Sequence, residues 1–218
     1  MQKLDPCDTM EPLVIIKFGG GLITFKDKLC EANYEAIRGL SEAVQTLMQQ
    51  NIRVIIVHGA GGFGHIKAKK WKLHLGFQAD LEGQFEAVEA VRNDMKSLST
   101  IVVQNLEKLG LKCHIFQPSA CQFIGTGSQL NCDLKDIFSS VKNSTIPILH
   151  GDVVPVNDST KFGILSGDDI CVKTVAEASK LNYKTSMVFA MTDAPGVLTL
   201  PPTDPKAELV KLTINIFS

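Results

Sequence analysis

The sequence predicts an α/β fold with a largely parallel central sheet that is covered by helices on both faces. Short apolar, β-branched runs alternate with longer segments of helical periodicity along the 218-residue chain. Two of these runs lead directly into glycine-rich turns, as strands do where they pass into ligand-binding loops. With 44% hydrophobic and 21% charged residues, the composition is that of a globular domain with a sizeable core.

The first half of the chain is predicted to contain two strands, each followed by a glycine-rich turn, and two helices. In chain order these are the strand 13–18 with the turn 19–21, the helix 31–50, the strand 53–57 with the turn 58–65, and the helix 81–109. Apolar residues recur at helical spacing in the first helix, and Gly110 lies where a C-cap is expected for the second.

The second half is predicted to contain further short strands, a hairpin and two helices. In chain order these are a strand 112–116, a helix 134–141, a strand 146–149, a hairpin of 153–156 and 162–165, a helix opened by 166–169 and running to about 181, and a strand 185–191. Ligands of parallel sheets bind beyond the carboxyl ends of the strands, so the glycine turns are expected to face one crevice.

Composition and charge exclude several classes of protein. The formal net charge is −1, so the chain lacks the basic field of a nucleic-acid-binding protein. No apolar run approaches the ~20 residues of a membrane span. Residues 1–12 lack a signal-peptide pattern, and we interpret them as a flexible segment before a domain over 13–218. The six cysteines are scattered without metal-binding spacing, which favours a reduced, cytoplasmic setting and predicts no metal held by the protein itself.

The two glycine-rich turns are the most informative feature for function. Glycine lets backbone N–H groups approach an anion closely, so two such turns predict several phosphates held between them. The P-loop pattern is absent. The dinucleotide pattern G-x-G-x-x-G is satisfied at Gly59, Gly61 and Gly64, but Asp80 and Glu82, at nearly the right distance, begin a helical segment instead of ending a strand. We therefore favour transfer between two phosphate esters over dinucleotide binding.

Charged side chains beside the turns are candidates to meet these phosphates. Lys17 interrupts an apolar strand, and because an unpaired buried ammonium is costly, it is expected to face the crevice and an anion. Lys26 follows the first turn, and His65 closes the second, where a ring N–H can donate to a phosphate oxygen. Asp168 is suited to hold two lysine ammonium groups in position, whereas Asp169 is equally well explained as a helix cap.

Other polar residues have structural interpretations. His58, at a strand end, is expected to bond the loop that follows it, and His74, His114 and His150 are expected to be structural or surface residues. Asp193 follows the last strand and is either a turn former or a contact to a nucleotide.

Together these segments resemble the amino acid kinase superfamily and, within it, the isopentenyl phosphate kinases. The resemblance rests on residues 16–21 with Thr24 and Lys26, on 57–65, 149–152 and 164–170, and on Thr192, Asp193, Gly196 and Val197. It spans residues 13–197, and the form H-G-x-G-x-F-G-H that ends in His65 is much narrower than the other signals.

The resemblance implies a three-layer α-β-α sandwich, with an ATP half toward the C-terminus and an acceptor half toward the N-terminus. It further implies ATP and Mg²⁺ as cofactors and a homodimer. By the same resemblance, the ATP phosphates are lined by Lys17, Gly19, Gly20, Gly21, Gly61 and Asp193. Lys26 would stabilise the transferring phosphoryl group, Asp168 would orient the lysines, and the substrate phosphate would contact Ala60, His65 and Gly167.

The activity that the resemblance implies is ATP-dependent phosphorylation of isopentenyl phosphate to isopentenyl diphosphate in isoprenoid biosynthesis. The acceptor oxygen is already anionic, so the reaction needs charge neutralisation and in-line positioning instead of a general base. A kinase of a phosphonate such as fosfomycin, or of an amino acid, is the alternative within the superfamily, since only the acceptor pocket separates them. His65 favours a phosphate or phosphonate acceptor over a carboxylate.

The family pattern continues with a D-x-T-G-G-M segment and a lysine that close over ATP, and the sequence up to Ser218 has neither. This raises the expectation of an incomplete ATP half, weakened nucleotide binding and an exposed apolar edge. A catalytically weak binding protein is therefore a further alternative. The helix 81–109 is expected to line the site for the apolar tail of the acceptor.

Overall fold

The computed structural model describes residues 10–120, 123–192, 199–200 and 204–209. A five-stranded sheet has the order β3-β4-β2-β1-β7, and all its strand pairs are parallel. Its strands are β1 (Pro12–Phe18), β2 (Arg53–His58), β3 (Cys113–Ile115), β4 (Ile146–His150) and β7 (Lys184–Ala190). A separate antiparallel hairpin consists of β5 (Asp152–Pro155) and β6 (Phe162–Leu165), as the sequence predicts.

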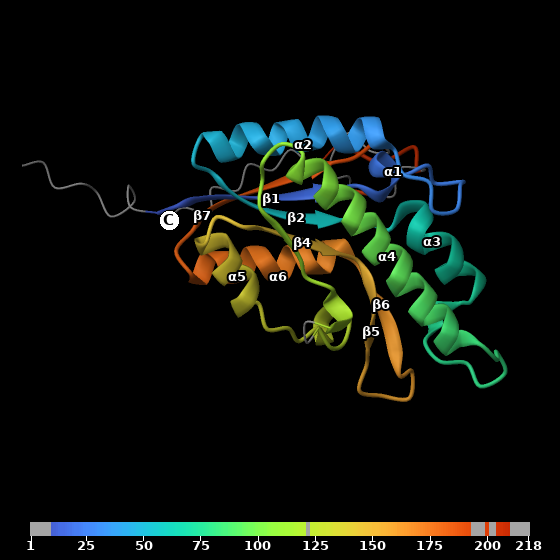
Figure 1. The fold of residues 1–218 in the computed structure, drawn as a ribbon. Coiled ribbons are helices and arrows are strands. Elements are labelled where there is room, and N and C mark those ends of the chain that lie inside the picture. The colour runs from blue at the N-terminus through green and yellow to red at the C-terminus, as the bar shows by residue number, and fades with distance from the viewer. Residues whose placement is uncertain (1–9, 121–122, 193–198, 201–203, 210–218) are drawn as a thin grey trace, which may run out of the picture.

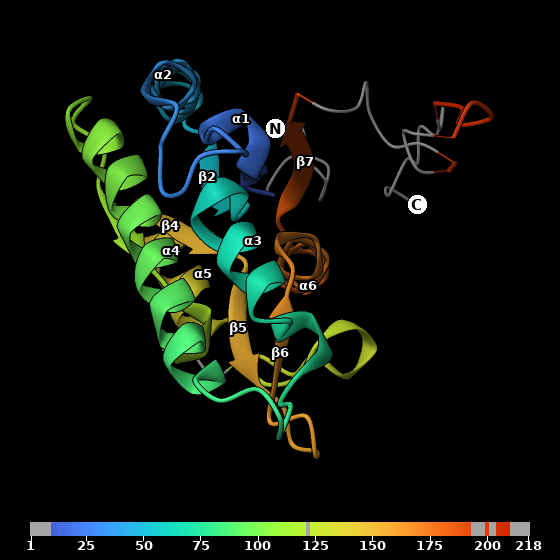
Figure 2. The same cartoon turned by 90° about the vertical axis from the view of Figure 1, so that its right-hand side faces the viewer.

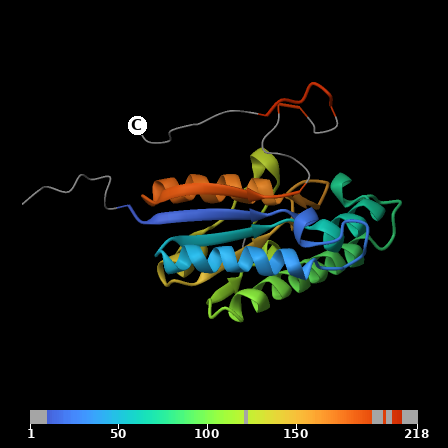
Figure 3. The ribbon, with the colours of Figure 1, turned by 90° about the horizontal axis from the view of Figure 1, so that it is seen from above.

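Helices cover both faces of the sheet. They are α1 (Gly20–Ile23), α2 (Tyr34–Gln49), α3 (Gly61–Lys70), α4 (Gln84–Glu107), α5 (Lys135–Lys142) and α6 (Gly167–Lys180). Figure 1 shows α2 above the strands and α5 and α6 below them. Seen from above, the long helices α2 and α4 run beside the strands (Figure 3), and α3 lies alongside α4 (Figure 2).

Each face of the sheet has its own hydrophobic core. Alternate residues of a strand point to opposite faces. In β1, Ile16 and Phe18 pack in the core that includes α2 and α4, whereas Leu13 and Ile15 pack in the core that includes α5 and α6. Since β1 is apolar on both faces, it has the pattern of a strand covered on both sides. The predicted three-layer α-β-α sandwich is confirmed.

Element boundaries differ from the sequence prediction at two helix starts. The helix expected from residue 31 begins at Tyr34, because Ala32 pairs with Thr24 in an isolated bridge and Asn33 serves as the N-cap. The helix expected from residue 81 begins only after Gly83, whose φ of +87° is left-handed.

The two glycine segments, which the sequence predicts to be turns, are largely helical in the structure. Residues from Gly61 onward form α3, so most of the second glycine segment is the start of a helix, and Gly20–Ile23 form the short helix α1.

The carboxyl ends of four strands lie at one level. Phe18 of β1 is in register with His58 of β2 and Ala190 of β7, and His58 is in register with His150 of β4. The segments that follow these residues therefore open toward one place. The β5–β6 hairpin extends beside α4 from the same end (Figure 2).

The sheet edge formed by β7 exposes apolar side chains. Val188 and Phe189 are 45% and 43% exposed.

Candidate active site

A cavity of about 360 Å³ lies at the carboxyl end of the sheet. Nine of the residues predicted from the sequence line it: Lys17, Gly19, Gly20, Gly21, Lys26, Ala60, His65, Gly167 and Asp168. They come from three segments of the chain, 17–26, 60–65 and 167–168, which lie at the ends of β1, β2 and the hairpin strand β6. The predicted common crevice is therefore present.

Lys17 is held by an ion pair at this cavity. Its Nζ lies 2.5 Å from Oδ1 of Asp168, which belongs to the first turn of α6. The Lys17 side chain is 13% exposed and that of Asp168 is 64% exposed. The sheltered ammonium thus has a carboxylate partner that stays in contact with solvent, and the expected pairing of Asp168 with this lysine is confirmed.

Lys26 lies across the first glycine segment. A Cβ placed on Gly21 would lie 2.0 Å from Cε of Lys26. The Lys26 side chain therefore occupies space that is open only because Gly21 has no side chain. Both lysines line the same cavity.

The two glycine segments pack directly against each other through Thr24. The Thr24 hydroxyl donates to the Gly20 carbonyl at 2.7 Å and accepts from the Gly62 N–H at 2.9 Å. Gly61 has a φ of +47°, and a Cβ there would lie 1.9 Å from Oγ1 of Thr24. Only glycine fits this position. Gly61 is buried and does not line the cavity, so its contact with ATP stays a prediction.

The N-terminus of α6 also faces the cavity. The Ser166 hydroxyl accepts from the Asp169 N–H at 3.0 Å and donates to Oδ2 of Asp169 at 2.8 Å. Ser166 is therefore the N-cap of α6, and Asp169 supports it from the first turn, whereas Ser166, Gly167 and Asp168 line the cavity. The first N–H groups of a helix favour an anion there.

His65 lines the cavity from α3, in the second turn instead of at the helix start. Burial, and then the positive charge of Lys26, lower its pKa from the ordinary histidine value. The ring is therefore neutral at pH 7 in the free protein and offers one N–H donor and one acceptor.

A pair of buried histidines supports the floor of the site. His58 and His150 have ring centroids 5.3 Å apart, and each Nδ1–H donates to the carbonyl of the following glycine, Gly59 at 3.2 Å and Gly151 at 2.9 Å. The Ser99 hydroxyl donates to Nε2 of His58 at 2.7 Å. Burial, and then His150, lower the pKa of His58 to about 3. Both histidines are structural, as expected.

Two walls of the cavity, from α4 and from the hairpin, are largely apolar. Val91 and Met95 of α4 line the cavity, as expected for the helix 81–109, and Ile164 and Leu165 of β6 line it from the hairpin. A Cβ on Gly64 would lie 3.2 Å from the Met95 sulfur, so this apolar surface directly adjoins the glycine segment.

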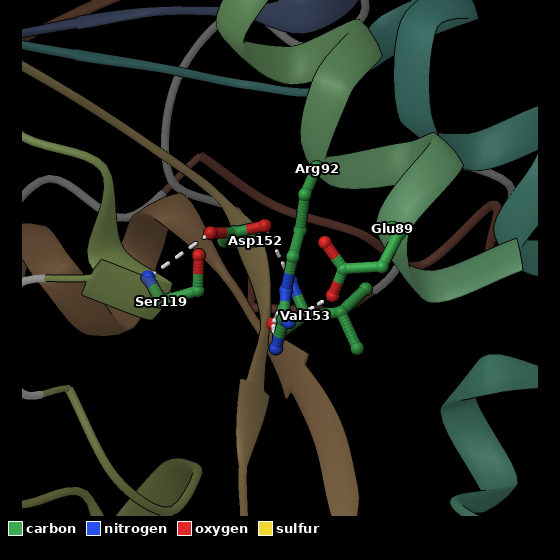
Figure 4. Close-up of polar contacts among 5 residues, drawn as sticks. All are labelled: Glu89, Arg92, Ser119, Asp152 and Val153. Carbon is green, nitrogen blue, oxygen red and sulfur yellow. Dashed lines mark hydrogen bonds and ion pairs between the residues drawn. The ribbon is translucent and has the colours of Figure 1, made fainter. Parts of the chain in front are cut away.

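Asp152 lines the cavity but was not singled out by the sequence. Its carboxylate accepts from the Ser119 N–H at 3.1 Å and from the Val153 N–H at 2.8 Å, and it is 4% exposed (Figure 4). In the sequence, a single aspartate after a strand looks the same whether its carboxylate bonds a distant backbone N–H or merely forms a turn.

Asp193 lies outside the described residues. The preceding residue, Thr192, lines the cavity. In the described part of the chain, no three His, Cys, Asp or Glu side chains come together as a metal site would require. Within that part, no helix has the length and hydropathy that crossing a membrane would need.

The fold and this anion-facing cavity define a kinase of the amino acid kinase type. The model of the amino acid kinase family matches residues 12–213, and the chain belongs to this family.

The chain is similar to isopentenyl phosphate kinases in particular. It is 26% identical over 193 residues to the isopentenyl phosphate kinase of Methanocaldococcus jannaschii, covering 85% of this chain and 71% of that protein. To the isopentenyl phosphate kinase of Haloferax volcanii it is 30% identical over 188 residues, with the same shares of 85% and 71%. A solved structure described as an X-ray structure of isopentenyl phosphate kinase superposes with a TM-score of 0.78 at 27% identity, covering 91% of this chain and 80% of that one.

Proposed function

We propose that this protein transfers the γ-phosphoryl group of ATP to isopentenyl phosphate, giving isopentenyl diphosphate and ADP. One observation carries the proposal: a single cavity combines Lys17, Lys26 and His65 with an apolar wall that includes Val91 and Met95. Such a cavity suits an acceptor with an anionic head and a short hydrocarbon tail. The similarity to isopentenyl phosphate kinases supports the same acceptor.

In the proposed reaction, an oxygen of the acceptor phosphate attacks the γ-phosphorus while the bond to the β–γ bridging oxygen breaks and ADP leaves. The acceptor oxygen is already ionised, so no side chain has to remove a proton. Catalysis then consists of holding two anions in line and neutralising the charge between them.

The residues have separate roles in this proposal. Lys17, Gly19, Gly20, Gly21, Gly61 and Asp193 hold the ATP phosphates; Ala60, His65 and Gly167 bind the acceptor phosphate. Lys26 stabilises the transferring group, and Asp168 positions Lys17, with which it pairs at 2.5 Å. Mg²⁺, when bound, neutralises charge on the ATP phosphates, whose oxygens together with water are its usual ligands. Asp168, whose carboxylate lines the cavity and is 64% exposed, would be the residue to contact that ion.

His65 is proposed to select the acceptor. As a neutral ring it donates one N–H to a phosphate oxygen, and a bound dianion favours its protonated form, which donates through both nitrogens. A phosphate or phosphonate dianion attracts the protonated ring more strongly than a single carboxylate does.

A coupled ADP-release assay with isopentenyl phosphate, fosfomycin and glutamate tests the proposal. Turnover is expected with isopentenyl phosphate alone, and His65→Ala is expected to lower kcat/KM for it by about 100-fold, the usual cost of losing one preorganised donor. His74→Ala is the matched control, because His74 is an exposed histidine that does not line the cavity. Binding of isopentenyl phosphate without turnover would instead favour a catalytically weak binding protein.

By resemblance to the family, we also propose that the protein is a homodimer and acts in the cytoplasm. Light scattering of the purified protein tests the first, with a mass of one chain contradicting it. Cell fractionation tests the second.

A further inference from the structure

Val153 is held in the cavity wall by two side chains that bond its backbone. Its N–H donates to Oδ1 of Asp152 at 2.8 Å, and its carbonyl accepts from both Nε and Nη2 of Arg92, at 2.9 and 2.7 Å (Figure 4). Val153 is fully buried. Both backbone polar groups of this residue, which lies opposite Ile164 in the hairpin, thus bond to side chains.

Arg92 connects the two apolar walls of the cavity. It belongs to α4, which presents Val91 and Met95 to the cavity, while Val153 belongs to the hairpin that presents Ile164. Val153 and Phe162 also pack in one apolar core with α4, and the bond from the guanidinium to the Val153 carbonyl adds a directional contact to that packing.

The chemistry of arginine suits this connection. The guanidinium is planar and rigid, so two of its N–H groups can converge on one oxygen, whereas a lysine ammonium provides a single flexible charge. The Arg92 side chain is 20% exposed, and its remaining arm pairs with Glu89, which is 63% exposed, at 2.5 Å. The contact to Val153 is sheltered and the contact to Glu89 is not.

The hairpin is fixed from its other side as well. The second oxygen of Asp152 accepts from the N–H of Ser119, in the 3₁₀ turn Pro118–Ala120. With that side anchored, Arg92 supplies the directional polar contact between β5 and α4, in addition to their apolar packing.

We propose that Arg92 is a specificity-determining positioning residue that fixes the width of the apolar part of the cavity and thereby restricts the acceptor to a short hydrocarbon chain. The proposal rests on the proposed function. Arg92 touches neither substrate; it acts by keeping Val153 and Ile164 at a fixed distance from Val91 and Met95.

The test compares kcat/KM for isopentenyl phosphate and for the next longer prenyl phosphate, geranyl phosphate. Arg92→Met keeps an apolar stem but removes all donors, and it is expected to raise the ratio of the longer to the shorter acceptor by about tenfold. Arg92→Lys is expected to give a smaller rise. Glu89→Gln is the matched control, since it removes only the exposed contact and leaves the ratio unchanged.

A purely structural role gives a different result. Loss of general stability lowers kcat/KM for both acceptors together, so an unchanged or lowered ratio in both Arg92 variants overturns the proposal. If Arg92→Met does not fold, Arg92→Lys decides alone. Failure of the parent protein to phosphorylate isopentenyl phosphate contradicts the proposed function; calorimetric affinities for the two prenyl phosphates, compared across the same variants, then decide the inference about Arg92.

Discussion

Replacing Thr24 with valine is expected to weaken the contact between the two glycine segments and to lower the stability of the protein. Valine keeps the shape of the side chain, and the Gly20 carbonyl keeps its bond from the Thr24 N–H at 3.0 Å. The Gly62 N–H, however, loses the hydroxyl that accepts from it at 2.9 Å, at a site where Thr24 is only 2% exposed. An orphaned buried donor costs about 1–3 kcal/mol. For a chain of this size that lowers Tm by about 2–12 °C.

The measurement is thermal and urea unfolding, followed by kinase assays on the same samples. Thr24→Ser keeps the hydroxyl and is expected to recover most of the stability. Thr46→Val is the matched control, because its hydroxyl donates to the Glu42 carbonyl at 3.0 Å on the exposed side of α2. Since both segments line the cavity, kcat of Thr24→Val is also expected to fall by about tenfold or more. A Thr24→Val variant within about 0.5 kcal/mol of Thr46→Val would refute this reasoning.

Three further outcomes are expected. Lys17→Met is expected to lower kcat/KM for ATP by about 100-fold, and Asp168→Asn by less, in steady-state assays at saturating acceptor; the reverse ranking contradicts the assigned roles. In His150→Asn, the amide N–H can take the place of Nδ1–H and donate to the Gly151 carbonyl, whereas the amide of His150→Gln cannot. Urea unfolding should therefore show the asparagine variant to be more stable than the glutamine variant by about 1 kcal/mol, despite its smaller volume. Equal stability of the two variants contradicts this role of Nδ1–H. The pKa of His58 is lowered to about 3 in the folded protein, while an unfolded histidine titrates near 6.5, so the contribution of His58 to the free energy of unfolding is complete above pH 6.5 and declines as pH falls toward 3. Urea unfolding from pH 7.5 to 5 should therefore show a smaller loss of stability in His58→Asn than in the parent protein. Equal losses in the two proteins contradict this expectation.

The part of the site that follows strands could be predicted from the sequence. Lys17 was predictable because a charge inside an apolar strand needs a partner, and the structure supplies Asp168. His65 was predictable because it follows β2, whose carboxyl end lies at this edge of the sheet. The inferences about Lys17 and His65 need only strand periodicity and the rule that parallel strands share a direction. Gly167 follows β6 of the separate antiparallel hairpin, so it was expected only from the family resemblance.

Several other contacts between elements far apart in the chain could not be predicted. Arg92 bonds a backbone carbonyl 61 positions away, and a carbonyl carries no residue identity that a sequence could display. The apolar spacing of Val91 and Met95 is the same for a helix in a core and for one that lines a cavity. Gly61 belongs to the pattern G-x-G-x-x-G, yet the structure places it against Thr24, since glycine also permits close backbone packing.

The unequal exposure of Lys17 and Asp168 explains why the pair suits a site that must accept phosphate. The lysine is sheltered and needs a permanent counter-charge, whereas the carboxylate, at 64% exposure, is stabilised by water even without the lysine. An incoming phosphate can therefore take over the ammonium without leaving a buried carboxylate uncompensated. The reverse arrangement, with a buried aspartate and an exposed lysine, would penalise the same exchange. This asymmetry is the physical reason to expect that loss of Lys17 costs more activity than loss of Asp168.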